Sequence, residues 1–384
     1  MEKIKKIELI KKYAPIIWVH KDDAYLPEDC QVMENEAKVG KSSSNMKPFR
    51  MDDLGKLKNS KKYYMDIPEI DFNNFGLNSD YQGPEMGPEA LSAHVKEKFG
   101  NNPFLDPNAR QPSPKYHARV AEINITPKKG EPFSEYYKIR DPGLFGDYHV
   151  IQYYFFFIFN DAWNKHVGDW DSTLELFIKK NKKRAYAILH MHHLTWMVKF
   201  SFRHKTLREW ITEWQKVRRK KHMGILYDLA AHPFVFIAKG AHGGYPTPGF
   251  SVHGLKPIIQ KVIGQTDYRQ IGKLCIFPDY PPVTKDAILK ILREADIDTS
   301  QTNFLSWEEA VILEKQPWLK YKGLWGTKSE YSGWSGPTGP SRKGCWRMDQ
   351  RRFKKAFKKA MDGDYSGEWI LKIFKNWHGW RELS

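Results

Sequence analysis

Cysteine is scarce in this sequence, and the few cysteines are far apart. The 384 residues include only three, Cys30, Cys275 and Cys345. None of them has the paired spacing of a structural zinc site or of a redox motif. A scaffold held together by disulfides is therefore not expected. The odd count, together with the lack of a short apolar signal segment, favours a reducing compartment or secretion by a route that needs no cleaved peptide.

Long apolar runs are also missing. The longest aromatic and aliphatic run, IQYYFFFIF at residues 151–159, has nine residues, whereas a membrane-spanning helix needs about twenty. The opening MEKIKKIELIKKYA has the pattern of a basic amphipathic helix, not that of the apolar core of a secretion signal. These absences predict a cytoplasmic or peripheral membrane protein without a signal peptide or a transmembrane helix.

Several signatures of catalysis are absent as well. The sequence contains no phosphate-binding GxxxxGK(S/T), no GxGxxG that opens a helix, no GxSxG elbow and no HExxH zinc motif. Nucleotide-dependent enzymes and serine hydrolases therefore lose most of their support.

The chain is instead rich in positive charge and in aromatic rings. Lysine and arginine number 62 against 45 acidic residues, which gives a formal net charge of +17. Apolar residues make up 41% and aromatic residues 14% of the chain, enough for a large globular core. The charge predicts attraction to polyanions: nucleic acid, anionic lipid headgroups or acidic glycans.

The basic residues are scattered, except in the segment 342–359. Within and just beyond it, RRFKKAFKKAM at 351–361 alternates basic pairs with Phe353, Ala356 and Phe357, an amphipathic helical pattern. A solvated face of a packed helix explains this pattern, and so does a surface for nucleic acid or a membrane. Both interpretations remain open.

Short β-branched and aromatic runs bounded by turn residues predict a mainly β fold. They are YHARVAEINITP, HVIQYYFFFIFN, STLELFIKK, RAYAILHMHH and HPFVFIAKG. Their spacing is typical of an antiparallel β-sandwich. We expect the sandwich core to span residues 10–255, with insertions at about 34–115 and 203–230.

Helical patterns lie in the insertions and after the core. ALSAHVKEKF at 90–99 and the amphipathic segment 205–221 are the expected helical insertions. Residues 256–384 are expected to form a C-terminal α-helical, loop-rich extension that packs on the sandwich, with helices at 285–295 and 306–315.

One short loop concentrates groups that bind metals. In NDAWNKHVGDWDSTLELFI, residues 160–178, His166, Asp169 and Asp171 lie close together and Asp161 precedes them. Carboxylate oxygens with one imidazole nitrogen suit magnesium, manganese or calcium. A turn in which Asp169 caps backbone amides and Asp171 starts the next strand explains the same spacing, and both interpretations remain open.

A second cluster follows the run HPFVFIAKG. His242 is flanked by Gly243 and Gly244, which leave the backbone free to approach a ligand, and Tyr245 offers a phenol nearby. His253 is a further candidate. We treat these three polar side chains as candidate ligand contacts, and His242 also as a candidate general base.

Several segments, in their order along the chain, resemble the vacuolar protein sorting-associated protein 62 family. They are YAPIIWVHKDDAYLP, IQYYFFFIFN leading into HVGDWD, HPFVFIAKGAHGGYPTPG, and KGLWG followed by GPTGP. The resemblance covers residues from about 13 to 345. Where the family more usually has HVGDWE, this chain has Asp171, and where the family commonly has SHA, the chain keeps only the histidine, His242.

The acidic loop is also similar to the GHRHDWE motif of the necrosis- and ethylene-inducing peptide family of secreted cytolysins. His166 matches the first histidine, Asp169 the aspartate and Asp171 the glutamate, while Gly168 stands at the second histidine. This resemblance implies a β-sandwich that holds a divalent cation and docks a sphingolipid sugar headgroup, with Asp161 as a further ligand.

Three functions stay open at this point. The resemblance favours a divalent-cation-dependent binding protein of the vacuolar-sorting 62-like type, which uses calcium or magnesium and recognises an anionic or sugar-bearing membrane headgroup. The second is a metal-dependent hydrolase of a phosphodiester or glycan, with His242 as base or acid. The third is a structural or interaction protein without a functional metal site.

Overall fold

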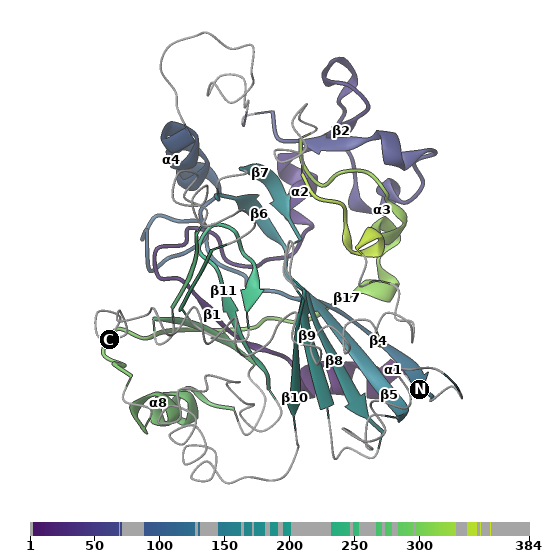
Figure 1. Ribbon diagram of the computed structural model, residues 1–384. Helices are drawn as coiled ribbons and strands as arrows, with labels where there is room; N and C mark the ends of the chain where they lie inside the picture. The colour runs from purple at the N-terminus through teal and green to yellow at the C-terminus, as the bar shows by residue number, and fades with distance from the viewer. Residues whose placement is uncertain are drawn as a thin grey trace.

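The described part of the chain is mainly β. The computed structural model describes residues 3–68, 70, 88–126, 130, 145–162, 165–170, 173–180, 185–190, 195–200, 232–245, 249–252, 266–270, 273–278, 283–294, 297–327, 336–343, 346 and 354. Two large sheets hold most of the strands, and three two-stranded pairs accompany them (Figure 1).

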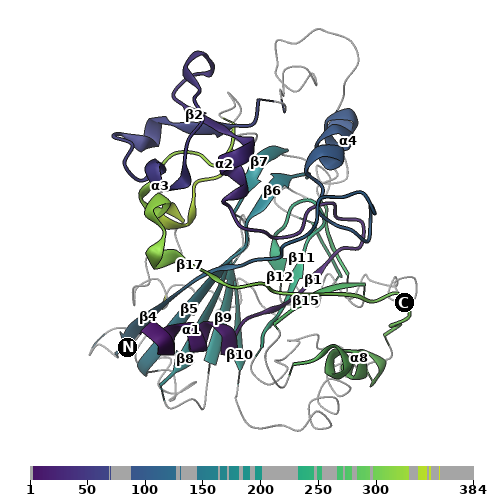
Figure 2. The same ribbon diagram turned by 180° about the vertical axis from the view of Figure 1, so that it is seen from behind.

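The six-stranded sheet has the order β10-β9-β8-β5-β4-β17. Its strands are β10 (Thr195–Phe200), β9 (Ala185–His190), β8 (Thr173–Lys179), β5 (Gly146–Tyr154), β4 (His117–Ile125) and β17 (Val311–Ile312). Neighbours are antiparallel, except that β17 runs parallel to β4. Helix α1 (Lys3–Lys12) lies across one face of this sheet and contacts β4 (Figure 2).

The five-stranded sheet has the order β12-β11-β1-β15-β16. Its strands are β12 (Gly244–Tyr245), β11 (Phe234–Ile237), β1 (Ile16–Val19), β15 (Leu274–Phe277) and β16 (Asn303–Ser306). β1 is parallel to β11, and β15 is parallel to β16. The expectation of purely antiparallel strands is therefore wrong for these two pairs and for β17 with β4.

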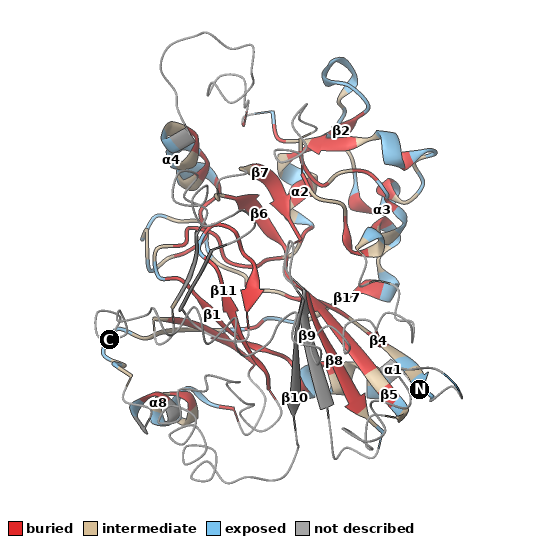
Figure 3. Cartoon of the chain, in the orientation of Figure 1, coloured by how far each residue is buried: buried red, intermediate tan, exposed pale blue. Residues whose placement is uncertain are grey.

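Alternation along β1 explains why all four of its residues are buried. Ile17 and Val19 belong to a core that also contains residues of the six-stranded sheet, whereas Ile16 and Trp18 pack in a second core with Ile288 of helix α8 (Lys285–Glu294). Successive side chains of a strand point to opposite faces. The middle of the five-stranded sheet is consequently buried on both sides (Figure 3).

The run HVIQYYFFFIFN forms two strands instead of one. It breaks after β5, and the chain resumes as β6 (Phe157–Asn160), which pairs with β7 (His166–Asp169) in a separate hairpin. At the break, the carbonyl of Phe156 accepts a hydrogen bond from the amide of Glu28 at 2.9 Å. The β6–β7 hairpin carries the acidic loop predicted to bind a cation.

Short elements fill the first expected insertion. They are α2 (Val32–Glu36), β2 (Lys38–Gly40), α3 (Met51–Leu54), β3 (Tyr64–Asp66) and α4 (Pro88–Phe99), with single 3-10 turns η1 (Ser43–Asn45) and η2 (Ser60–Lys62). The helix predicted at 90–99 is confirmed by α4. The helix predicted at 205–221 lies outside the described residues.

The region after residue 255 departs from the expected helical extension. Its described residues contribute α8, as predicted, together with β14 (Thr266–Arg269), which pairs with β13 (Gly249–Val252), and with β15, β16 and β17. The helix predicted at 306–315 is wrong, since β17 and the 3-10 turn η3 (Leu313–Lys315) occupy that stretch. Short 3-10 turns η4 (Pro317–Lys320) and η6 (Pro340–Arg342) follow.

Candidate functional site

His242 lies in a tight turn between β11 and β12. Two backbone hydrogen bonds of 2.9 Å close the turn, from the amide of Ala238 to the carbonyl of Gly243 and from the amide of His242 to the carbonyl of Ala238. Gly240 and His242 have φ angles of 67° and 51°, in the left-handed region that glycine adopts freely and other residues only rarely. The turn holds the imidazole in the protein interior.

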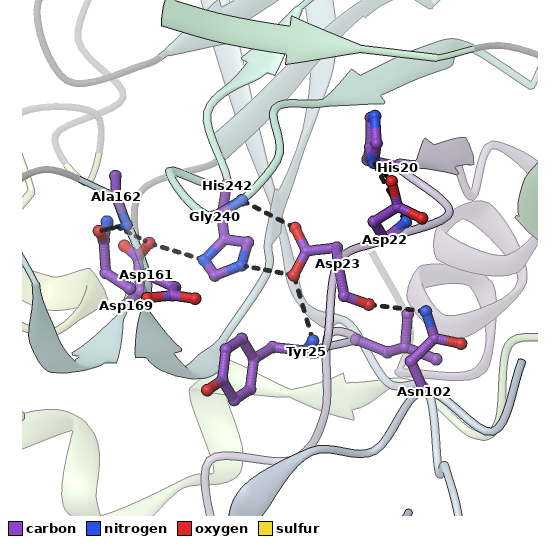
Figure 4. A network of polar contacts seen from close by, with 12 residues as sticks. His20, Asp22, Asp23, Tyr25, Asn102, Asp161, Ala162, Asp169, Gly240 and His242 are labelled. Atoms are coloured by element: carbon purple, nitrogen blue, oxygen red, sulfur yellow. Dashed lines mark hydrogen bonds and ion pairs between the residues drawn. The ribbon is translucent and has the colours of Figure 1, made fainter. Parts of the chain in front are cut away.

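Two carboxylates face the two nitrogens of this imidazole (Figure 4). Nδ1 of His242 lies 3.1 Å from Oδ2 of Asp169, and Nε2 lies 3.5 Å from Oδ1 of Asp23. The ring stacks on Phe157, with 3.9 Å between centroids and 3° between planes, and Tyr25 meets it edge-on. We call Asp23, Asp169 and His242 the buried network, because all three are almost completely inaccessible to solvent.

The charges of the buried network stabilise one another. Burial by itself lowers the pKa of His242, but Asp23 and Asp169 outweigh burial and raise this pKa to about 9. Burial raises the pKa of Asp23, yet His242 and the amides of Gly240 and Tyr25 offset burial and lower it. At neutral pH the imidazole is therefore a cation held between carboxylates.

This arrangement suits a structural role for His242 better than proton transfer. A general base must reach its substrate and must be unprotonated near the working pH. His242 is 0% exposed, and its raised pKa keeps it protonated. Asp23, which is not among the predicted site residues, is the partner that completes the network.

Asp169 is held by its own hairpin as well as by His242. Its Oδ2 accepts a hydrogen bond of 3.1 Å from the side-chain amide of Asn160, and the other end of that amide accepts the backbone N–H of Ala162 at 3.0 Å. The carboxylate thus ties the end of β7 to β6 and to the loop that follows β6.

Asp161 lies just after β6 and is engaged by other partners. Its Oδ1 accepts hydrogen bonds from the Ser92 hydroxyl of α4 at 2.6 Å and from the ammonium of Lys165. The same ammonium lies 3.2 Å from the backbone carbonyl of Asp161. Because the Asp161 side chain is 28% exposed, this pair borders solvent, unlike the buried network.

The structure does not bring Asp161, His166 and Asp169 together around one point. Among the described residues, these three do not form a group whose ligand atoms all lie within 4.8 Å of one another. His166 and Asp169 are three positions apart on β7, and between them Gly168, at a φ of 67°, interrupts the regular strand geometry. Asp171 lies outside the described residues.

The other predicted ligand contacts do not join His242. Tyr245 is buried in the second core, with α8, whereas the network partner of His242, Asp169, ends the β6–β7 hairpin. His253 lies outside the described residues. The glycine-rich turn thus places His242 alone among these candidates in the network.

Segments far apart in the sequence meet at the β6–β7 hairpin. Gly168 has a φ of 67°, and a Cβ added to it would lie 1.9 Å from the carbonyl oxygen of Trp325. A Cβ on Gly326 would lie 1.9 Å from the carbonyl oxygen of Val167 and 3.0 Å from Cα of Gly336. The segments HVGDWD, KGLWG and GPTGP therefore pack backbone against backbone, which requires glycine.

A cavity of about 570 Å³ lies on the first insertion and has a basic rim. It is lined by Val39, Lys41, Asn45, Lys47, Pro48, Phe49, Arg50, Asp53, Leu54, Leu57 and Tyr63. We call it the basic cavity. Lys41, Lys47 and Arg50 are exposed at its rim, while Leu54 is buried. It combines positive charge with an apolar wall.

The strongly basic segment 342–359 is described at only four positions. Lys354 is 7% exposed, and the guanidinium of Arg119 lies 3.4 Å above the ring of Trp346. Arg342 donates a 2.6 Å hydrogen bond to the carbonyl of Lys322. At these positions the segment packs against the rest of the protein.

In comparisons with known proteins, no family model matches the chain, and neither does any curated protein or solved structure. In the part of the chain that the structure describes, no helix has the length and apolar character needed to cross a membrane.

Proposed function

We propose that this chain is a binding protein of the vacuolar-sorting 62-like type that recognises an anionic or sugar-bearing membrane headgroup, with a divalent cation as cofactor and a β-sandwich as scaffold. The observation that carries the proposal is the basic cavity. An exposed positive rim above apolar residues fits an anionic headgroup that is attached to an apolar body.

The positive charge of the rim is only partly cancelled. Asp53, the acidic residue of the lining, forms an ion pair with Lys56 at 2.6 Å. Arg50 lies 4.0 Å from Glu34. Among the described residues, no carboxylate lies within ion-pair distance of Lys41 or Lys47, and the Lys41 ammonium lies 5.0 Å from the centre of the Tyr63 ring.

The buried network supports the binding function indirectly. It joins three distant segments and is inaccessible to a ligand, so its role is to fix the scaffold. A hydrolase that uses His242 as a base would need an exposed, neutral imidazole. The geometry therefore favours binding over the hydrolytic alternative.

In this proposal, the divalent cation binds at Asp161. A carboxylate oxygen and a backbone carbonyl of this residue already face one positive group, the Lys165 ammonium. Both are hard oxygen donors of the kind that calcium and magnesium prefer. A bound ion would supply positive charge there in place of the ammonium.

Vesicle binding tests the headgroup proposal. Full-length protein would be sedimented with phosphatidylcholine vesicles that are neutral, enriched in phosphatidylserine, or enriched in a neutral glycosphingolipid. We expect binding to one enriched set, and at least about tenfold weaker binding for Lys41→Glu/Lys47→Glu, since each basic residue near a charged surface contributes about 1 kcal/mol. Preference for the glycolipid would identify a sugar headgroup.

A matched variant makes this test specific. Lys58→Glu/Lys61→Glu changes the net charge by the same amount as Lys41→Glu/Lys47→Glu. Lys58 and Lys61 are exposed but do not line the cavity. Equal losses for both pairs would indicate diffuse attraction without a site. Tight binding to nucleic acid with no binding to any vesicle would instead favour the polyanion alternative.

A thermal-shift series tests the cation. Calcium or magnesium should raise the melting temperature of the wild type by mass action, and Asp161→Asn should abolish the rise. An unchanged melting temperature in the wild type would remove the cation from the proposal and favour a binding or structural protein without a metal.

A further inference from the structure

A cluster of three metal-ligating side chains lies away from the buried network and the basic cavity. Asp29 and Cys30 end the loop before α2, and His117 is the first residue of β4. A carboxylate oxygen, the thiol sulfur and a ring nitrogen of these residues all lie within 4.8 Å of one another. Among the described residues, no other group of histidine, cysteine and acidic side chains meets this condition.

The surroundings hold two of these side chains in place. His117 is 0% exposed and packs edge-on against Trp170, with 4.8 Å between ring centroids. Asp29 Oδ1 lies 3.6 Å from Nε2 of His117 and accepts the amide of Gln31 at 3.0 Å. The Lys115 ammonium lies 3.7 Å from the other oxygen, Oδ2. One carboxylate oxygen is therefore directed at the imidazole.

We propose that Asp29, Cys30 and His117 bind a zinc ion. Sulfur, nitrogen and oxygen donors together are a set that zinc accepts, whereas calcium and magnesium prefer oxygen alone. The inference does not rest on the proposed headgroup binding, because none of the three residues lines the basic cavity.

The site has access to solvent on one side. A cavity of about 290 Å³ adjoins it, lined by Asp29, Gln31, Val32, Glu34, Asn35 and Lys115. Asp29 is 27% exposed, while Cys30 and His117 are fully buried and do not line this cavity. Solvent therefore reaches the three side chains from the side of Asp29.

Binding changes the protonation of the cysteine. Burial raises the pKa of the Cys30 thiol well above its usual value, so without metal the sulfur carries its proton. Formation of the zinc–sulfur bond releases that proton to solvent. Without metal, Nε2 of His117 accepts a hydrogen bond of 3.3 Å from the backbone amide of Cys30. This hydrogen bond is lost when the lone pair of Nε2 binds the metal.

The chain provides its own control cysteine. Cys275 is as buried as Cys30, and burial likewise raises its thiol pKa well above the usual value. It lies on β15 in the second core, and among the described residues it belongs to no metal-ligating group. A thiol in this setting should not retain zinc.

Metal content after dialysis tests the site in the full chain. Protein would be stripped with a chelator, reloaded with zinc, dialysed and analysed for metal by mass spectrometry. We expect about one zinc per chain in the wild type, in Cys275→Ser and in Cys345→Ser. Cys30→Ser and Asp29→Asn should retain at least tenfold less. The asparagine keeps an acceptor for the Gln31 amide, so this variant should fold.

Cobalt provides a second readout that reports the sulfur directly. Cobalt(II) in place of zinc should give a thiolate charge-transfer band in the near ultraviolet that Cys30→Ser lacks and Cys275→Ser keeps. Absence of retained zinc in the wild type would overturn the proposal. Equal zinc retention by the wild type and by Asp29→Asn or Cys30→Ser would overturn it as well.

Discussion

The buried network and the basic cavity use charge in opposite ways. In the network, an imidazole and two carboxyl groups are withdrawn from water, and each lies within 3.5 Å of a partner. In the cavity, Lys41 and Lys47 stay in solvent, and no described carboxylate pairs with them. One arrangement fixes the backbone, and the other leaves charge available to a ligand.

This difference predicts which residues contribute to the stability of the fold and which contribute to ligand binding. A buried charge that loses its partner must be desolvated without compensation, and this is among the largest single-residue effects on folding. An exposed lysine interacts through screened solvent, so its removal changes stability little. Variants of the two regions should therefore separate the two properties.

His242→Leu should have the largest effect. It leaves Asp23 and Asp169 buried without their cation, and we expect the free energy of unfolding to fall by about 3–5 kcal/mol. Urea denaturation would measure it. A decrease in the free energy of unfolding of less than about 1 kcal/mol would mean that water replaces the imidazole. The buried network and the basic cavity would then not differ in their effect on stability.

The network should also make stability depend on pH. The pKa of His242 rises from 6.5 to about 9 on folding, so its contribution is complete below pH 6.5 and is lost as the pH rises through 9. In this window the folded state keeps a proton that the unfolded state releases. The free energy of unfolding should fall by about 1.4 kcal/mol per pH unit, or about 3 kcal/mol in total.

The reference for the pH series is His242→Leu, because this variant lacks the imidazole that titrates between pH 6.5 and 9. Two other histidines, His20 and His232, have their pKa lowered to about 4 by burial and titrate below the window. The same slope in wild type and variant between pH 6.5 and 9 would assign the dependence to other groups.

Gly168→Ala tests the packing that surrounds the network. The new methyl group would lie 1.9 Å from the carbonyl oxygen of Trp325, at a φ of 67°. We expect a loss of about 3 kcal/mol. Gly130→Ala is the matched control, since Gly130 has a φ of 74° but no atom of the described residues within 4 Å of its added Cβ. It should lose only the conformational part, about 1–2 kcal/mol, and equal losses would argue against the close approach.

The cavity variant should have the smallest effect on folding. Lys41→Glu/Lys47→Glu should change the free energy of unfolding by less than about 0.5 kcal/mol, even though it weakens vesicle binding. Urea denaturation measures the change in stability, and the vesicle assay measures the change in binding. A loss comparable to that of His242→Leu would show that the rim is part of the scaffold.

The strands were predictable because their residues are β-branched or aromatic and are bounded by turn residues. Their partners were not. β17 pairs with β4 across nearly two hundred positions, and the same residues, within SWEEAVILEK, fit a helical pattern locally. Pairing with the distant strand β4 makes this segment a strand instead of a helix. The local spacing of residues carries no information about such a distant partner.

The site was predictable only in part. His242 and Asp169 were identified, and they are in contact. Asp23 was not, because KDDAYLP contains two neighbouring aspartates and only the fold decides that Asp23 is buried while Asp22 is 41% exposed. His166 was predicted at the same site as Asp169 because the two are close in sequence, whereas among the described residues Asp161, His166 and Asp169 do not form one ligand group.

The position of β1 has a consequence for the order in which the protein can assemble. Residues 16–19 form the middle strand of their sheet, and their two neighbours are residues 234–237 and 274–277. During synthesis the first strand must wait for more than two hundred further residues before either neighbour exists. Such non-local pairing slows folding and leaves apolar segments exposed meanwhile. The nascent chain is therefore expected to depend on chaperones until β15 has left the ribosome.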